Sequence, residues 1–276
     1  MPRTKRNSAD IAPDADNPLN VAVSRRDGSV LQTVGRALDA GEVMLAFQPV
    51  MQTRAPGDVA FYEGLVRVLD ETGRVVPARD FIATAEDTEL GRKLDCQALR
   101  LGLQALLRHP ELRLAINMSA RSIGYKRWRQ ILDRFLARHK DVGNRLILEI
   151  TEASAMTLPE IVSGFMSELQ GTGICFALDD FGAGPVSLRY LKDFYFDAVK
   201  IDGQFVRGVH ASADNQVIVT ALIAVARQFD LLTIAENVED RADAEVLQQM
   251  GVDCMQGYLF GAPSVLPPWL PRTASA

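Results

Sequence analysis

Short apolar runs alternate with helical patterns from residue 31 nearly to the end of the chain. Runs at 43–50 and 59–69 predict two strands, and a helical stretch over roughly 79–108 follows them. Further strands are expected at 112–119, 145–152, 174–182, 196–206, 231–239 and 253–261, with helices at 127–139, 158–169, 187–193, 215–229 and 242–251. About eight strand–helix units without a linker predict a parallel sheet that closes into a barrel.

Polar residues recur where the apolar strand runs end. They are Glu63, Asn117, Glu149, Asp179, Asp180, Lys200, Asp202, Glu236 and Gln256. Any one of them could be a helix cap or a solvated turn residue. In an α/β barrel, however, the carboxyl ends of the strands meet at one face, where active sites are built. The repetition therefore favours a shared site over a series of unrelated caps.

Composition narrows the class of protein. The length of 276 residues and the hydrophobic content of 47% suit one barrel with a large core. A net charge of −5 provides no general basic surface for a nucleic-acid polymer. Cys96, Cys175 and Cys254 lie far apart in or beside apolar stretches, which indicates reduced core cysteines and a cytoplasmic protein.

The ends of the chain differ from its middle. Residues 1–30 begin with a polar stretch that lacks the apolar segment of a signal peptide, so we expect a flexible tail there. The domain is expected over 31–270, followed by a short tail at 271–276. No apolar run approaches the length of about 18 residues that a membrane span requires.

Clustered carboxylates with an amide and without His or Cys form a hard-oxygen site, which suits Mg²⁺ or Mn²⁺. Adjacent acids such as Asp179 and Asp180 can bridge two cations and support phosphodiester cleavage. Neighbouring strand residues point to opposite faces, so a straight strand could not direct both inward. The glycines that follow, in the sequence GAG at 182–184, would permit a sharp turn there.

Other polar residues have roles that this chemistry suggests. Lys200 would be held by the carboxylates and would orient water or stabilise charge on a phosphate. Glu236 can act as a general base or a metal ligand, and Arg67 is a candidate phosphate clamp. Gln48 and Gln256 could orient substrate or could simply be satisfied strand-end amides.

Eight motifs then point to a family. The sequences FQPV, YEGLVR, INMSA, LEITE, LDDFGAG, VKIDGQFV, AENVE and QGYLF occur in the order found in bacterial EAL domains, over residues 43–262. The chain thus resembles the phosphodiesterases that act on cyclic di-GMP. The resemblance implies a TIM-like (β/α)8 barrel whose first strand is antiparallel. It also implies two Mg²⁺ or Mn²⁺ ions, hydrolysis of cyclic di-GMP to linear pGpG and a homodimer.

The resemblance assigns roles residue by residue. Metal ligands are expected at Glu63, Asn117, Glu149, Asp179 and Asp180. Lys200 and Glu236 match catalytic positions, and Glu152 matches the glutamate that braces the loop after the two aspartates. Substrate-side or supporting positions fall at Gln48, Arg67, Asp202 and Gln256.

The chain departs from the family pattern at four positions. Gly64 replaces the alanine of the signature, and Asn237 replaces a glycine, although Asn tolerates positive φ better than other residues. Pro185 and Val186 replace an aromatic or polar residue and a serine in the loop that couples the metal site to the dimer interface. Proline fixes φ and removes a donor, so the loop's dynamics are expected to differ.

Three alternatives to an active phosphodiesterase follow. The chain could be a cyclic di-GMP receptor that signals through a regulatory protein partner, or an unrelated metal-dependent barrel enzyme such as an enolase-type lyase or isomerase. The second option explains the acids but not the ordered motifs. A kinase interpretation of the DFG triplet fails, because no glycine-rich phosphate loop or HRD sequence accompanies it.

Overall fold

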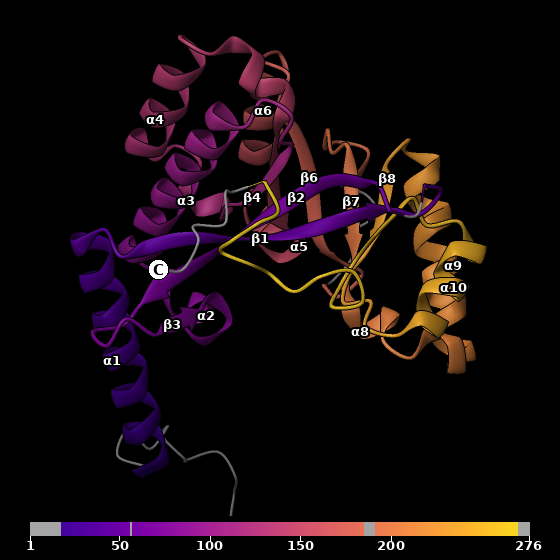
Figure 1. The fold of residues 1–276 in the computed structure, drawn as a ribbon, viewed down its shortest axis with the longest axis horizontal. Helices are drawn as coiled ribbons and strands as arrows, with labels where there is room; N and C mark the ends of the chain where they lie inside the picture. The colour runs from indigo at the N-terminus through magenta and orange to yellow at the C-terminus, as the bar shows by residue number, and fades with distance from the viewer. Residues whose placement is uncertain (1–17, 56, 185–190, 270–276) are drawn as a thin grey trace, which may run out of the picture.

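Eight strands close into a barrel in the computed structural model, which describes residues 18–55, 57–184 and 191–269 (Figure 1). Neighbouring strands follow the order β1-β9-β8-β7-β6-β5-β4-β2, and β1 pairs with β2 to close the ring. These strands are β1 (Val43–Gln52), β2 (Val59–Leu69), β4 (Leu114–Asn117), β5 (Leu146–Thr151), β6 (Cys175–Phe181), β7 (Ala198–Ile201), β8 (Leu232–Ala235) and β9 (Cys254–Gln256). A TIM-like barrel is thereby confirmed.

The first strand runs against both of its neighbours, as expected. β1 is antiparallel to β2 and to β9, whereas all the other neighbouring pairs of barrel strands are parallel. A short connection between β1 and β2 permits this hairpin, because antiparallel strands need no crossover helix. The pairing sets Gln48 opposite Glu63.

Helices cover the outside of the barrel and lie between consecutive strands (Figure 1). The longer helices are α1 (Pro18–Ala40), α3 (Glu89–Arg108), α4 (Lys126–Leu136), α6 (Pro159–Gln170), α9 (Ala213–Gln228) and α10 (Arg241–Met250). Short helices are η1 (Ala78–Asp80), α2 (Ile82–Ala85), η2 (Ala120–Ser122), η3 (Lys140–Arg145), α5 (Glu152–Thr157), α8 (Gly203–Val206) and η4 (Val209–Ala211). No helix in the described ranges combines the length and hydropathy needed to cross a bilayer.

The core lies between the strands and this helical layer. Parallel strands are buried on both faces, which explains why their sequences form nearly continuous apolar runs. Leu148 and Phe176 on β5 and β6 are fully buried, and Phe176 packs against Phe165 of α6. Trp128 of α4 contacts the same Phe165 ring. This packing fixes the positions of the strand ends that carry the polar residues.

The region expected to form one long helix differs from the sequence prediction. The helix expected over 79–108 is divided into η1, α2 and α3, and a short strand, β3 (Val75–Pro77), precedes it. Thr88 begins α3 anew, because its side chain accepts a hydrogen bond from the Leu90 amide. Part of the helix expected at 187–193 lies outside the described residues.

The N-terminal boundary also differs. α1 begins at Pro18, so residues 18–30 of the expected tail are helical. Val34 and Ala37 of α1 are fully buried against a small core that includes Phe81 and Leu94. Packing of the C-terminal half of α1 against this core stabilises the helix. Helix formation then extends cooperatively into the preceding turns. Residues 1–17 and 271–276 of the expected tails lie outside the described ranges.

Candidate active site

All eight barrel strands contribute a polar side chain to one end of the barrel. The contributing residues are Gln48 (β1), Glu63 (β2), Asn117 (β4), Glu149 (β5), Asp179 (β6), Lys200 (β7), Glu236 directly after β8, and Gln256 (β9). Glu63 is not at the end of its strand, because β2 extends beyond the barrel mouth to pair with β3. Its pairing with β4 stops at Gly64, so Glu63 lies at the same level as the other strand ends.

Lys200 is the centre of this ring. Its side chain is 1% exposed, and its Nζ lies 2.8 Å from Glu236, 3.0 Å from Glu149, 3.3 Å from Glu63 and 3.4 Å from Asp179. A buried ammonium is stable only when it is paired. Four carboxylates from four strands supply that pairing, which explains a lysine at the end of an apolar strand.

The two glutamines and Asn117 form a network that orients Glu63. Asn117 Nδ2 donates to Glu63 Oε1 at 2.6 Å, and Gln256 Nε2 donates to Glu63 Oε2 at 2.6 Å. Gln256 also donates to Gln48 Oε1 at 3.2 Å, while Gln48 donates to the Gly261 carbonyl at 3.0 Å. Gln256 therefore supports the Glu63 carboxylate directly, and Gln48 supports it through Gln256.

The adjacent aspartates adopt a geometry that the sequence analysis did not predict. Asp180 itself takes a left-handed conformation with φ 57°, and the β6–β7 register shifts between Leu178 and Phe181. This β-bulge inserts one residue and re-aims the side chains, so both carboxylates face the barrel mouth. Gly182 is also left-handed, at φ 94°. The turn therefore begins at Asp180, two residues before the first of the glycines that were expected to provide it.

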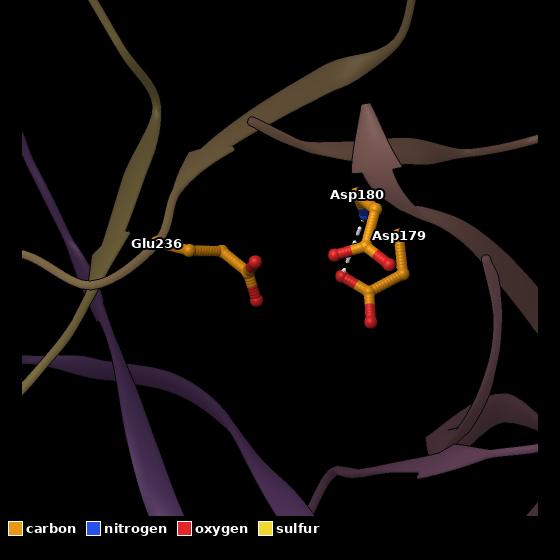
Figure 2. A group of neighbouring side chains, drawn as sticks. All are labelled: Asp179, Asp180 and Glu236. Carbon is orange, nitrogen blue, oxygen red and sulfur yellow. Dashed lines mark hydrogen bonds between the residues drawn. The ribbon is translucent and has the colours of Figure 1, made fainter. Parts of the chain in front are cut away.

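Asp179, Asp180 and Glu236 form the group best placed to bind a cation. One carboxylate oxygen from each lies within 4.8 Å of the others. Figure 2 shows Glu236 facing the two aspartates, with the Asp180 amide donating to Asp179 Oδ1 at 3.0 Å. Glu149 Oε1 and Gln256 Oε1 are buried oxygens without a hydrogen-bond partner among the described residues. This set of hard oxygen donors fits Mg²⁺ or Mn²⁺.

The positive charge of Lys200 is too small to neutralise all the carboxylates of the ring. Burial and the neighbouring Asp179 raise the pKa of Glu236 to about 8, and burial and Asp179 raise the pKa of Asp180 to about 6. Burial and the charge of Glu63 hold the pKa of Glu149 well above its usual range. One lysine cannot neutralise five carboxylates, so the cluster attracts further cations or protons.

Glu63 and Glu149 shift in opposite directions although both contact Lys200. Burial would raise the pKa of Glu63, but Lys200 and the amides of Gln256 and Asn117 together lower it. Among the described residues, Glu149 receives a hydrogen bond only from Lys200 and keeps an unpartnered oxygen. Burial, the negative charges of Glu63 and Asp179, and the lack of amide donors together leave the pKa of Glu149 raised. For Lys200, burial opposes ionisation, but the carboxylates raise its pKa well above the ordinary value.

Glu152 braces the turn that follows the aspartates. It is 2% exposed, and its Oε2 accepts a hydrogen bond from the Gly182 amide at 3.1 Å. A side chain at Gly184 would contact the same carboxylate. The expected bracing contact is therefore present at the start of the loop. Pro185 and Val186, which were expected to alter this loop, lie outside the described residues.

Two departures from the family pattern have local compensation. Asn237 adopts the left-handed conformation, with φ 54°, that glycine would favour. A Cβ at Gly64 would lie 2.8 Å from Ile116 Cδ1 and 3.3 Å from Leu45 Cδ1. The bulk of these two side chains thus fills the space that an alanine methyl would need.

Two cavities meet at Glu63. One, of about 490 Å³, is lined by Gln48, Arg67, Arg207, Asn237 and Tyr258 among others. The second, of about 400 Å³, is lined by Ile82, Leu94, Asp95 and Ala98 together with Asn117, Asp179 and Asp180. Glu63, Leu65 and Ala78 line both. The acids therefore lie where two chambers join.

Arg67 and Asp202 occupy supporting positions at this site. Arg67 lines the first cavity and donates to the Val66 carbonyl at 2.9 Å. Asp202 caps α8 by accepting from the Gln204 amide at 2.6 Å, and its charge raises the pKa of Asp180. Capping explains Asp202 at least as well as substrate contact does.

The sequence analysis missed Asp95, Arg207 and Tyr258, which line the cavities. Asp95 Oδ2 accepts from Ser122 Oγ at 2.5 Å and from the Ser119 amide at 3.1 Å. An acid between Leu94 and Cys96, both buried, was the available signal, because the inner side of a helix seldom carries a carboxylate. Arg207 is the C-terminal cap of α8 and Tyr258 follows β9, and neither position carried such a signal.

Comparison with known proteins gives one consistent result. The family model described as "EAL domain" matches residues 31–263. The chain is 31% identical over 242 residues to the cyclic di-GMP phosphodiesterase PdeF of Escherichia coli (strain K12), covering 86% of the chain and 32% of that protein. It is 30% identical over 241 residues to the cyclic di-GMP phosphodiesterase PdeB of Shewanella oneidensis, covering 84% and 28%. The chain thus spans about a third of the length of these relatives.

Solved structures resemble the fold over most of the chain. The FimX EAL domain from Pseudomonas aeruginosa bound to c-di-GMP has a TM-score of 0.78 and 27% identity, covering 86% of this chain and 97% of that one. The complex of the PaMucR phosphodiesterase with c-di-GMP has a TM-score of 0.74 and 29% identity, with the same coverage of 86% and 97%.

Proposed function

The chain belongs to the EAL domain family, and from that premise we propose that it hydrolyses cyclic di-GMP to linear pGpG with two divalent cations. The observation that supports this most strongly is the complete ring of acids around Lys200, which is filled at every position expected from the sequence. Relatives named as cyclic di-GMP phosphodiesterases point to the same substrate.

The metal ions would be Mg²⁺ or Mn²⁺, held by Asp179, Asp180 and Glu236 together with Glu63, Asn117 and Glu149. When bound, a pair of such cations lowers the pKa of a water molecule and stabilises charge on the phosphate. The close approach of Glu236 to both aspartates favours a ligand role for this residue over that of a separate general base.

The shape of the site suits a dinucleotide. Two cavities that join at Glu63 would each hold one nucleoside and leave a phosphodiester beside the acids. Tyr258, which is 61% exposed at the first cavity, can stack on a purine. In the second cavity, the Asp95 carboxyl can pair with the N–H groups on the edge of a guanine.

The chain's own residues would bind and orient the reacting phosphate. Lys200 keeps its positive charge because four carboxylates surround it, so it can stabilise negative charge that develops on the phosphodiester. Arg67 lines the adjoining cavity, where a guanidinium can bind phosphate oxygens. Glu152 holds the turn after Asp180, and thereby the position of both aspartates.

A homodimer is the expected assembly, and α9 is the surface that supports it best. Its outward side includes Val217, which is 70% exposed, and the exposed Ala221 and Ala224. Leu222 of the same helix lies within contact distance of Gly182, directly after the aspartates. We propose that a second copy covers this apolar side. Light scattering of the native chain and of Val217→Glu would test it, since the variant is expected to shift toward monomer.

A cyclic di-GMP receptor without turnover is the second candidate function, favoured by the replacement of glycine by Asn237. The experiment incubates the purified chain with cyclic di-GMP and Mn²⁺, separates the nucleotides, and measures binding by calorimetry in parallel. Formation of pGpG by the native chain but not by Glu63→Gln supports the hydrolase. Saturable binding without product supports the receptor, and absence of both overturns each proposal.

The cytoplasmic location stays a prediction.

A further inference from the structure

Charge is distributed unevenly over the chain. Between residues 92 and 145 there are 13 Lys and Arg against four Asp and Glu, although the whole chain has a net charge of −5. This segment forms α3, β4, α4 and η3, which occupy one side of the barrel (Figure 1). One side of an acidic protein is therefore strongly basic.

Six of these cations lie on α3, on α4 and in the turn directly after α4. The spacings of seven and eight residues on α3, and of seven residues on α4, place the cations of each helix on one side of it. We call them the α3–α4 basic face: Lys93, Arg100, Arg108, Arg127, Arg134 and Arg138. All but the half-buried Lys93 are exposed. The two helices are neighbours, because Tyr125 at the start of α4 donates to Glu89 of α3 at 2.6 Å.

The basic face lacks compensating acids. Within the described ranges, none of its six members forms an ion pair, and Arg100 contacts only the Gln97 amide, at 3.3 Å. Apart from Glu111, which follows α3, the nearby acids bind other groups: Glu89 pairs with Arg92, Asp133 and Glu168 with Arg129, Asp141 with Arg145, and Asp95 with Ser119 and Ser122. Like charges this close repel one another, so a partner that supplies negative charge would be favoured.

The shape and composition of the face distinguish between polyanions. Leu107, next to Arg108, is 46% exposed, and an apolar side chain among cations suits the boundary between lipid headgroups and acyl chains. Trp128 is 1% exposed and cannot stack on bases. The end of α3 is held firmly, because Arg145 donates to the carbonyls of Leu106, His109 and Leu112.

We propose that the α3–α4 basic face docks the chain on a membrane surface rich in anionic lipid headgroups. Each Lys or Arg near such a surface contributes about 1 kcal/mol. Since α3 and α4 lie on the side of the barrel, the mouth that carries the acids stays accessible to a ligand from solution (Figure 1). The proposal does not depend on hydrolysis.

The test is flotation of the full chain with vesicles of phosphatidylcholine alone or with 30% phosphatidylglycerol, each at 0.1 and 0.5 M NaCl. We expect binding only to the anionic vesicles, and loss of that binding at the higher salt concentration, where the screening length is halved. The triple variant Arg100→Glu, Arg127→Glu, Arg134→Glu should bind anionic vesicles at least about 100-fold more weakly than the native chain. Loss of three cations removes about 3 kcal/mol of binding free energy, and each 1.4 kcal/mol corresponds to a tenfold change in affinity.

A matched control makes the same change of charge elsewhere. Arg74→Glu, Lys192→Glu, Arg241→Glu alters three exposed cations outside the face and should bind vesicles within about threefold of the native chain. Thermal unfolding of both variants checks that they fold. Equal weakening by the two variants, or no binding to anionic vesicles, overturns the proposal. Binding of a 30-base-pair DNA duplex in place of the vesicles would also overturn it and assign the face to nucleic acid.

Discussion

Asn237 fills the space that a side chain at residue 203 would occupy. A Cβ at Gly203 would overlap the Asn237 amide and lie 2.7 Å from its Cβ. Asn237 directly follows Glu236 and has φ 54°, so this close approach constrains the backbone beside a carboxylate of the acid cluster. The asparagine at a family glycine position is thus accommodated by a glycine at the start of α8, which follows the neighbouring strand β7.

This contact predicts strong coupling between the two positions. Gly203→Ala should destabilise the native chain by about 1–3 kcal/mol through overpacking, and Asn237→Gly should be neutral or stabilise it by up to about 1 kcal/mol. When Asn237 is already replaced by glycine, the Gly203→Ala change should lower the free energy of unfolding by less than about 1 kcal/mol. Urea unfolding of the native chain, the two single variants and the double variant measures this difference. Free energies that add within about 0.5 kcal/mol would show that the residues do not interact.

Lys200→Met should change stability in a metal-dependent way. Removal of the ammonium leaves four buried carboxylates without their shared cation, at a cost of about 3–5 kcal/mol. Divalent cations should recover more stability in the variant than in the native chain, while turnover stays at least about 100-fold lower. Thermal unfolding with EDTA and with 5 mM Mn²⁺ measures the first effect. Equal stabilisation of both proteins by Mn²⁺ would contradict the expected compensation of the lost lysine charge by metal, and stabilisation of neither would argue against metal binding among these carboxylates.

Glu152→Ala should weaken metal binding without removing a ligand. The Gly182 amide loses its acceptor, and the turn that positions Asp179 and Asp180 becomes less constrained. Supporting partners of metal ligands are typically worth 10–100-fold in affinity. We expect the Mn²⁺ concentration for half-maximal rate to rise by that factor. Glu160→Ala, on the exposed side of α6, is the control, and the same shift in both variants would contradict the bracing role.

Asp95 predicts a specific pH dependence of stability. Burial raises its pKa to about 7 in the folded chain, from 3.8. Between these values the folded state binds the proton and the unfolded state does not, so stability falls as pH rises from about 4 to about 7. Asp95→Asn removes this contribution and should be more stable than the native chain at pH 8, by on the order of 1–3 kcal/mol, but not at pH 4. Parallel pH profiles of the two proteins would contradict the assignment.

The barrel and most of its site could be predicted from sequence, for a physical reason. Parallel strands are buried on both faces, so a polar residue at the end of an apolar run stands out, as Glu149 and Lys200 do. The barrel then brings all such ends to one face. Local sequence thus located the site, while the ordered motifs identified its family.

Contacts that depend on three-dimensional arrangement were not predictable in this way. No local pattern indicates that Lys200 binds four carboxylates, that Gln256 orients Glu63, or that Asp180 is left-handed. Asp95 was missed because its partners, Ser119 and Ser122, lie on a loop that follows another strand. The helical start of α1 at Pro18 depends on packing of its second half against the barrel.

The central claim is that this ring of acids uses divalent cations to hydrolyse cyclic di-GMP. The most direct measurement is the initial rate of pGpG formation at saturating cyclic di-GMP as Mn²⁺ is titrated into the EDTA-treated chain. We expect no product without metal, a saturable rise in rate with Mn²⁺, and reversal by added EDTA. Product formation that is independent of metal, or none at saturating Mn²⁺ and substrate, would contradict the claim.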